Sequence, residues 1–470
     1  DARDDDASQE ANTTDTKPLD KKANIMSDRD YDLVIFGATG DAGRAMTTLL
    51  AESAPPSLRW TIAGRSRSKL EALAPAGSKL KILVADCADD AALLVLAART
   101  RVLISAAGPF SMLGERVMLA CIEAKTHYVD ITGEVPWAAE MRRLHGARAV
   151  AAGVCIASFC GYDCVPIELG LYIGRQALGT PLSFAESVLI MPPGGEGGAP
   201  RGTLLTSLAL MHNVPGILRG LLNYVDPPGC VTPPGRRMAL LASLLACVLP
   251  RWSGHVQGFT LPHFMFWCNT PIVHASAACV GRPHSSAVTD AIDAATATPP
   301  AALRFRDAML LPHCDRWFTL WGLLPLLAIY IGLVLVSPAW VLLAVPPIKR
   351  AAQRKLLGSY SYAGSKTART IFRIHAVGGA KTARVDMELP GDGGIFATAL
   401  LATTCGRAML DVLDGKAEAF AGQRGSLPAG LCSPVEALGG ALEGQLRATP
   451  GVRLEVSVAP DAASARSKAE

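Results

Sequence analysis

The chain has 470 residues and a net charge of +4, and 50% of its residues are hydrophobic. A chain of this length and composition can bury a large core, and we expect it to form two domains. No basic block interleaved with aromatic residues occurs, which argues against nucleic acid as a partner. The twelve cysteines include no C-x-x-C pair. Without a secretory signal, they are expected to be reduced thiols in a protein that is not secreted.

The N-terminal segment, residues 1–29, is polar and rich in acidic side chains. Such a composition cannot bury enough apolar surface to fold, so we expect this segment to be disordered. Met26 stands just ahead of the first apolar run and is either an internal residue or a true start.

The first predicted strand runs into a glycine-rich turn and then into a helix. The stretch Tyr31–Gly43 reads YDLVIFGATGDAG, and its apolar run Leu33–Phe36 fits one buried strand. Strand, glycine turn and helix in this order predict the opening of a dinucleotide-binding βαβ unit. We expect Gly37 to allow the tight turn, Gly40 to admit a pyrophosphate at the helix N-terminus, and Gly43 to let the helix pack on the strand. A purely structural turn is the alternative, because the spacing is G-x-x-G-x-x-G.

The second predicted strand, Trp60–Ala63, ends in the loop Gly64–Arg67, which contains two arginines and no acidic residue. In dinucleotide-binding domains an acidic residue here binds the ribose hydroxyl of NAD, whereas an arginine accommodates the extra phosphate of NADP. Guanidinium groups suit a phosphate by charge and by geometry. The loop therefore predicts NADP(H) in preference to NAD(H), and a solvated basic loop is the alternative.

Loops after the later strands contain further candidate contacts. Asp86 follows the third strand, where it either borders the adenine or caps the next helix. Ala107, Gly108 and Pro109 follow the fourth strand, and their small size permits close approach of the nicotinamide half of a cofactor. Six strands with intervening helices predict a doubly wound α/β domain; they are Leu33–Phe36, Trp60–Ala63, Leu80–Ala85, Val102–Ser105, His127–Ile131 and Val154–Ala157.

Five motifs in this region, FGATGDAG, AGRS, AAGPF, YVDITGE and GYDCVPIELG, occur in an order that resembles the saccharopine-dehydrogenase-like oxidoreductase family. The likeness is greatest to its animal members and to the bacterial trans-acting enoyl reductases, and it is strongest over Tyr31–Ile173. The resemblance implies a Rossmann domain that binds NAD(P), a second α+β domain and a C-terminal helix that returns to the first. It does not imply saccharopine as the substrate.

The resemblance also assigns cofactor-binding roles to individual residues. Two positions depart from the family pattern: Asp41-Ala42, where relatives carry an aromatic and a small polar residue, and Cys160 and Cys164, where serine is usual. The matching residues are Gly37, Ala38, Thr39, Gly40, Asp41, Ala42 and Gly43 for the phosphates, Arg65 and Ser66 for the 2′-phosphate, and Ala107, Gly108 and Pro109 beside the nicotinamide.

Together these patterns divide the chain into a Rossmann domain at 30–163, a second domain at 164–393, a C-terminal segment at 394–458 that returns to the first domain, and a frayed tail at 459–470. The aromatic run Phe259–Trp267 is interpreted as a core strand or as pocket lining. Other elements expected after residue 164 are a strand at Ser183–Ile190, paired strands at Thr370–Val377 and Ala380–Leu389 that turn at Gly378-Gly379, a helix at Phe396–Leu413 and a strand at Val452–Val458.

The apolar segment 317–348 contains no charged side chain before Lys349. Its first twenty residues are long enough for a membrane span, and a basic cluster follows it, as is typical of an anionic cytosol-facing surface. A full span would separate the C-terminal helix from the Rossmann domain. Prolines such as Pro325 and Pro338 favour a hairpin that enters an apolar layer and returns. A buried core segment of the second domain is the alternative.

Candidate catalytic residues are few. Tyr162 and Asp163 follow the sixth strand at the rim where a substrate should lie, and Asp130 and Glu134 lie near the end of the fifth. Each has an alternative role in capping or loop hydrogen bonding, and this structural role is favoured. Cys160 and Cys164 are interpreted as small buried side chains rather than zinc ligands, so no metal site is expected.

Two functions compete at this point. The first is an NADP(H)-dependent oxidoreductase that transfers hydride to an apolar or lipid-linked small molecule, because the cofactor carries such chemistry. The second is a non-catalytic nucleotide-binding protein at a membrane or lipid-droplet surface. Both place the protein at the cytoplasmic face of a membrane or lipid droplet, and the sequence leaves a homodimer open.

Overall fold

Seven parallel strands form the first sheet of this computed structural model, and they are β1 (Tyr31–Phe36), β2 (Trp60–Gly64), β3 (Ile82–Val84), β4 (Thr100–Ser105), β5 (His127–Asp130), β6 (Cys155–Ala157) and β13 (Gly430–Cys432). Their order is β13-β6-β5-β4-β1-β2-β3, so the chain winds outward from β1 in both directions. The doubly wound fold expected from the sequence is thereby confirmed. The described residues are 28–74, 80–190, 200, 202–204, 214–225, 235–248, 250–279, 303–310, 347–348, 350–351, 354, 362–419 and 425–461.

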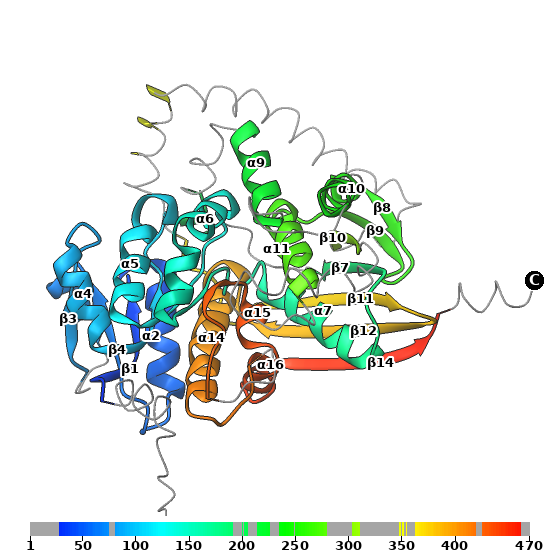
Figure 1. Cartoon of the computed structure of the whole chain (residues 1–470). Helices are drawn as coiled ribbons and strands as arrows, with labels where there is room; N and C mark the ends of the chain where they lie inside the picture. Colours follow the sequence, from blue (N-terminus) through cyan, green and yellow to red (C-terminus); the bar gives the residue numbers. More distant parts are fainter. Residues whose placement is uncertain are drawn as a thin grey trace, which may run out of the picture.

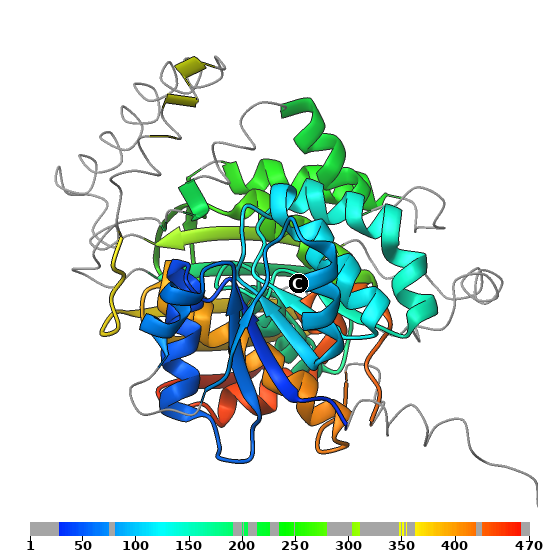
Figure 2. The ribbon, with the colours of Figure 1, turned by 90° about the vertical axis from the view of Figure 1, so that its left-hand side faces the viewer.

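Helices cover both faces of this sheet (Figures 1 and 2). Along β1, Leu33 and Ile35 join one apolar cluster while Val34 and Phe36 join the other, as the twofold periodicity of a strand requires. The first cluster includes side chains of α2 (Asp41–Ser53) and α14 (Thr398–Leu413). The second includes side chains of α4 (Asp90–Ala98), α5 (Phe110–Ala124) and α6 (Val135–Ala152), and α3 (Arg67–Leu73) follows β2.

The second sheet is mixed and also has seven strands, in the order β14-β12-β11-β7-β10-β9-β8. Figure 1 shows it beside the first sheet, with the long strands β11, β12 and β14 in yellow to red. The strands are β7 (Phe184–Ile190), β8 (Arg251–Ser253), β9 (Gly258–Pro262), β10 (Arg304–Leu310), β11 (Arg369–Gly378), β12 (Lys381–Pro390) and β14 (Arg453–Pro460). Its helices are α7 (Val165–Leu178), α9 (Val214–Val225), α10 (Arg236–Val248) and α11 (Phe266–Cys279).

The C-terminal part of the chain contributes to both sheets. A π-helical turn, η3 (Gly393–Ala397), leads into α14, which packs on α2 and β4 as expected. Strand β13 and helices α15 (Pro434–Leu438) and α16 (Gly440–Arg447) follow. The boundary at 394–458 needs a correction, however, because β14 pairs with β12 in the second sheet instead of returning to the first. This pairing satisfies the backbone groups on the outer edge of β12.

Three local expectations also differ from the structure. Arg29, placed in the disordered segment 1–29, is only 8% exposed, because its guanidinium donates to the carbonyls of Ala97, Thr100 and Ala124. The β11–β12 turn lies at Gly379-Ala380 rather than Gly378-Gly379, since Gly378 pairs with Lys381. The run Phe259–Trp267 is no single strand: β9 ends at Pro262 and α11 begins at Phe266.

The apolar segment 317–348 lies almost wholly outside the described residues, so its expected hairpin is neither supported nor contradicted. Among the described residues, one helical stretch, Gly393–Leu413, has the length and hydropathy of a membrane span, and 78% of its apolar window is buried inside the protein. That stretch is η3 with α14, which packs against the first sheet.

Candidate functional site

The turn after β1 approaches the loop after β4. Gly37 has a φ of +79°, and a Cβ atom on it would lie 2.8 Å from the backbone nitrogen of Ala107. The backbone nitrogen of Ala106 in turn donates to the carbonyl of Phe36 at 2.8 Å. The structure therefore brings together the predicted phosphate loop and the predicted nicotinamide loop, and only glycine fits where they meet.

Gly43 and Gly40 are glycines for different reasons. A Cβ on Gly43 would lie 2.4 Å from the carbonyl oxygen of Gly37, so close packing of α2 on the turn excludes any side chain. Gly40 has an ordinary extended backbone, and its Cβ would lie 3.4 Å from the oxygen of Gly37 and 4.0 Å from that of Ala106, which is ordinary contact. No protein atom explains the glycine at position 40, which fits the space a pyrophosphate would take.

The N-terminus of α2 is the anion-binding end of this turn. Gly40 caps the helix without a side-chain hydrogen bond, so no side chain competes with a phosphate for the first N–H groups. Asp41 is exposed in the first turn and would oppose an anion. Arg44, whose Nε donates to the carbonyl of Thr39 at 2.9 Å, offsets that charge. Sequence reasoning missed Arg44, although a basic residue in the first turn of the helix was visible.

The predicted 2′-phosphate loop follows β2, next to β1. Arg65 is exposed, and within the described part of the chain its side chain forms no hydrogen bond or ion pair. Arg67 is also exposed, but its Nη1 lies 3.7 Å from Oε1 of Glu71. Ser66 caps α3 without a side-chain bond to it. Of the two arginines, Arg65 is therefore the one free to take a phosphate.

Asp86 lies close to this loop, because the nitrogen of Ala85 donates to the carbonyl of Gly64. Its exposed carboxylate accepts from the backbone nitrogen of Ala88 at 2.9 Å. The N-cap of α4 is Asp89, which accepts from Ala92. Asp86 is thus not the helix cap, and its place beside the adenine site stays a prediction.

Glu134 fixes the start of α5, directly after the nicotinamide loop. It is 1% exposed, and its carboxylate accepts from the backbone nitrogens of Phe110 at 2.7 Å and Ser111 at 3.0 Å. A negative charge at a helix N-terminus is favourable. Because this carboxylate occupies the anion site of α5, the phosphates are left to α2, and Ala107–Pro109 hold a defined position.

Asp130 is fully buried at the end of β5. It accepts from Ser158 Oγ and the nitrogen of Thr132, both at 3.0 Å, and burial raises the pKa of its carboxyl to about 7. These contacts join the loops after β5 and β6, which is a positioning role.

Tyr162 and Asp163, the weak catalytic candidates, differ in environment. The Tyr162 ring is 4% exposed and packs edge-on against Phe372 of β11, with ring centroids 5.0 Å apart. Its nitrogen donates to Thr398 Oγ1, so it joins η3–α14 to the second sheet. Asp163 is partly exposed, and desolvation raises the pKa of its carboxyl to about 7. Tyr162 is a packing residue, whereas Asp163 keeps the properties of a proton donor.

The cysteines expected to be buried thiols are buried. Cys160 Sγ lies 3.5 Å from the carbonyl of Ala157, and Cys164 Sγ lies 3.7 Å from Cys268 Sγ. The described residues contain no cluster of three or more potential metal ligands.

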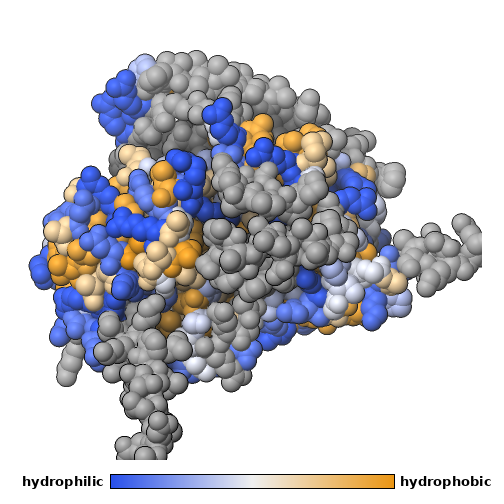
Figure 3. All heavy atoms as spheres, viewed as in Figure 1, coloured by the Kyte–Doolittle hydropathy of each residue, from blue (hydrophilic) through white to orange (hydrophobic). Residues whose placement is uncertain are grey.

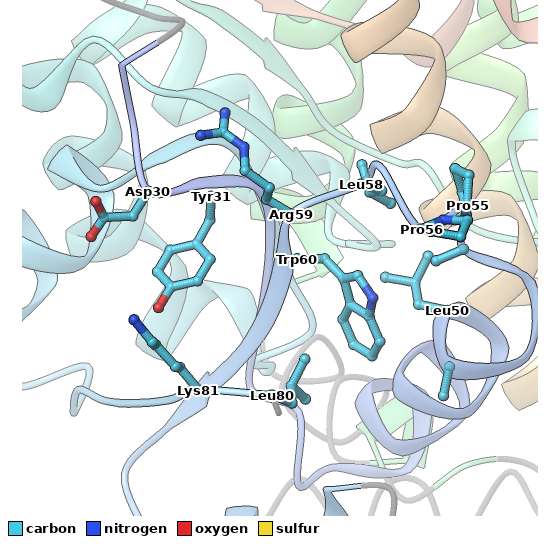
Figure 4. Close-up of a pocket in the computed structure, with 12 residues that line it drawn as sticks. Asp30, Tyr31, Leu50, Pro55, Pro56, Leu58, Arg59, Trp60, Leu80 and Lys81 are labelled. Atoms are coloured by element: carbon cyan, nitrogen blue, oxygen red, sulfur yellow. The ribbon is translucent and has the colours of Figure 1, made fainter. Parts of the chain in front are cut away.

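A hollow of about 700 Å³ opens at the opposite edge of the first sheet (Figure 4). Tyr31 and Trp60, at the amino ends of β1 and β2, line it together with Arg59 and Lys81. Ligands of doubly wound folds bind at the carboxyl ends of the strands, so this hollow is not the cofactor site.

A glycine turn open to a pyrophosphate, an uncapped helix N-terminus and a free arginine after β2 define a dinucleotide-binding domain of the NADP type. Residues 33–156 match the family model described as the saccharopine dehydrogenase NADP binding domain. NADP(H) is accordingly the cofactor, as the arginine loop predicted.

Three relatives match over part of their length. A lipid droplet localized protein of Caenorhabditis elegans is 33% identical over 176 residues, which is 36% of this chain and 41% of that protein. The human saccharopine dehydrogenase-like oxidoreductase is 33% identical over 184 residues, 36% of this chain and 43% of its own. A Mycobacterium tuberculosis protein named as a putative trans-acting enoyl reductase is 31% identical over 201 residues, which is 41% of this chain and 48% of that protein. The chain thus matches less than half the length of each relative.

Among solved structures, saccharopine dehydrogenase (L-Glu forming) from Saccharomyces cerevisiae aligns over 91% of this chain and 100% of its own. The TM-score is 0.44 and the sequence identity is 16%.

Proposed function

We propose that this protein is an NADP(H)-dependent oxidoreductase whose substrate is an apolar or lipid-linked carbonyl compound, such as an enoyl thioester. The observation that carries the proposal is the free Arg65 beside a glycine turn whose second glycine, Gly40, has no protein neighbour to explain it. The names of the relatives, an oxidoreductase and an enoyl reductase, agree with it.

The geometry of the site suggests a role for each of its residues. When bound, the cofactor supplies the hydride. The turn at Gly37–Gly43 and the N-terminus of α2 hold its phosphates, and Arg65 selects its 2′-phosphate. Glu134 orients the loop against which the nicotinamide half rests. Asp163, whose carboxyl pKa is raised to about 7 by desolvation, is the proton donor.

The apolar character of the substrate is supported by the surface of the second domain. Met238 and Leu245, seven residues apart on α10, are 68% and 71% exposed, and Trp252 of β8 is 44% exposed. Residues seven apart lie on one face of a helix. Figure 3 shows some orange surface in this upper part of the molecule, as it does over the first domain. Exposed apolar groups of this kind fit a phospholipid-covered surface, and one relative is named for its lipid-droplet location.

The test of the reaction is consumption of NADPH. The protein is incubated with NADPH and a lipid extract, and absorbance of the reduced cofactor is followed alongside direct measurement of NADPH binding. Oxidation that requires both extract and protein, and that is lost with Arg65→Ala at limiting NADPH, supports the proposal. Tight NADPH binding without oxidation by any lipid fraction favours the rival, a non-catalytic nucleotide-binding protein.

The surface is tested separately by flotation with phosphatidylcholine vesicles. The double variant Met238→Asp with Leu245→Asp should lose binding, because each charge would have to enter the apolar layer. The matched control is Val95→Asp with Leu144→Asp, two exposed apolar residues of the first domain. Equal flotation of both double variants would remove α10 from the proposed surface.

A further inference from the structure

A buried polar cluster lies where β9 gives way to α11. His263 and Asp307 are fully buried, and Asn269 is 1% exposed. Asn269 Nδ2 donates to Asp307 Oδ2 at 2.8 Å and lies 3.2 Å from Nδ1 of His263. Three such groups in an apolar interior are costly unless every donor and acceptor is used.

The tautomer of His263 follows from its neighbours. The backbone nitrogen of Met265 donates to Nδ1 at 3.2 Å, so Nδ1 carries no proton. Burial lowers the pKa of the imidazole to about 3, so the ring is neutral and its single proton sits on Nε2. Asp307 Oδ2, 3.3 Å from Nδ1, is compatible with this tautomer because burial raises the pKa of its carboxyl to about 8 and keeps it protonated.

Two groups of this cluster lack a partner within the protein. They are Nε2 of His263 and Oδ1 of Asp307, each buried and without a hydrogen bond. A buried N–H left without an acceptor destabilises the folded protein, because its hydration is lost without replacement. An acceptor supplied by a bound molecule would satisfy the Nε2–H donor of His263.

The cluster lies against the carboxyl edge of the first sheet, where a substrate must meet the cofactor. A Cβ on Gly133, in the turn after β5, would lie 3.1 Å from Met265 Cε and 4.0 Å from Cys268 Sγ. The charge of Asp163 raises the pKa of Asp307, so these carboxyls are near each other.

Apolar walls flank the free donor. Phe372 lies between His263 and Tyr162, with ring centroids 6.5 Å and 5.0 Å away, respectively. Phe264 stacks on His263 at 4.5 Å and is 54% exposed. A single N–H donor among aromatic rings suits an apolar molecule that has one polar acceptor.

We propose that the Nε2–H group of His263 binds the carbonyl oxygen of the substrate and stabilises the negative charge that this oxygen gains on hydride transfer. The inference rests on the proposed function. Hydride adds to the substrate carbon, the carbonyl π electrons move to the oxygen, and the Asp163 carboxyl gives its proton to the resulting enolate or alkoxide. The Asp163 carboxylate then recovers a proton from water. A neutral imidazole acts here as a hydrogen-bond donor and never loses its proton.

The first test compares His263→Asn with His263→Gln, using the decenoyl thioester of N-acetylcysteamine as the probe. An Asn amide replaces the Nδ1 side of the ring and leaves no donor at Nε2, whereas a Gln amide reaches the Nε2 position. Loss of one such donor costs about 100-fold or more in kcat. We expect that loss for His263→Asn, partial rescue by His263→Gln, and unchanged NADPH affinity in both. Equal activity of both variants with the intact protein would overturn the proposal.

A second readout does not depend on turnover. In protein labelled with ¹⁵N-histidine, with NADP⁺ bound, the saturated decanoyl thioester should shift the Nε2 resonance that is missing from the His263→Gln spectrum. Binding of this thioester without a shift at His263 refutes the donor role. A shift at His263 without any NADPH oxidation by the unsaturated thioester would support the donor role of His263 and refute the proposed reaction. No binding of either thioester refutes the substrate class.

Discussion

Glu134 Oε1 lies 2.7 Å from the backbone nitrogen of Phe110, across 24 residues of sequence. The contact ties the turn after β5 to the loop after β4 at the point where a nicotinamide would rest. Its energy comes from a charge placed at a helix N-terminus and from two charge-assisted hydrogen bonds.

Replacing Glu134 tests this positioning. Glu134→Gln keeps the size of the side chain, but it removes the charge. It also replaces one of the two oxygens that accept from backbone N–H groups by an NH₂ group, which donates. We expect a loss of about 1–3 kcal/mol in the free energy of unfolding and weaker NADPH binding, measured by denaturant titration and by fluorescence. Glu140→Gln is the control, because Glu140 is an exposed residue of α6, the helix that Glu134 precedes, and is paired with Arg143. Unchanged NADPH affinity in Glu134→Gln would mean that the loop needs no such anchor.

Arg65 should determine the choice between the two nicotinamide cofactors. Arg65→Ala removes one or two bonds to the 2′-phosphate, each worth roughly 1.5–3 kcal/mol, so affinity for NADP(H) should fall on the order of tenfold or more. Affinity for NAD(H) should stay nearly constant. Arg67→Ala is the matched control, since Arg67 already faces Glu71. If both variants lose NADP(H) equally, the phosphate is shared by the two side chains.

Substitutions at two glycines of the phosphate turn should affect different properties, nucleotide binding in one case and stability in the other. Gly40→Val should fold, because a Cβ there would lie no closer than 3.4 Å to any protein atom, yet it should abolish binding of either nucleotide by filling the pyrophosphate space. Gly43→Ala should destabilise the protein, because its Cβ would lie 2.4 Å from the Gly37 oxygen. Circular dichroism and NADPH titration of both variants decide this. Normal binding by Gly40→Val would place the phosphates elsewhere.

The parts of the site that the sequence predicted are local in the chain. The turn at Gly37–Gly43 and the loop at Arg65 depend on order and spacing over a few residues, which a periodic pattern reveals. The contact of Glu134 with Phe110 and the addition of β13 to the first sheet join distant segments. No periodicity encodes such contacts.

The His263 cluster escaped prediction for a related reason. His263 lies in an aromatic run that resembled a strand, and the break between Pro262 and Phe266 carries no glycine. Its partner Asp307 is 44 residues away in the sequence and lies between Arg306 and Ala308 on β10. Arg29 was likewise hidden by the acidic composition of the segment before it, although its guanidinium satisfies helix-end carbonyls in the first domain.

The buried Glu168 should make stability depend on pH. It accepts from Ser433 Oγ and from the nitrogen of Val435 at 3.2 Å, and burial raises the pKa of its carboxyl from 4.5 to about 8. Between these values the folded state binds more protons than the unfolded state, so the contribution of Glu168 to stability is full at low pH and is lost as pH rises towards 8. Each unit of that range accounts for up to about 1.4 kcal/mol.

Glu168→Gln cannot titrate and should remove this part of the slope. Urea unfolding of the variant and of the intact protein is compared from about pH 5 to about pH 8. The difference in unfolding free energy should favour the intact protein most at the acidic end and shrink as the pH rises. The difference isolates Glu168 because Asp130 and Asp307, whose pKa values are also raised, titrate in both proteins. Glu443→Gln, at a residue paired with Arg447 on α16, is the control. A constant difference across the range would show that Glu168 is ionised in the folded protein.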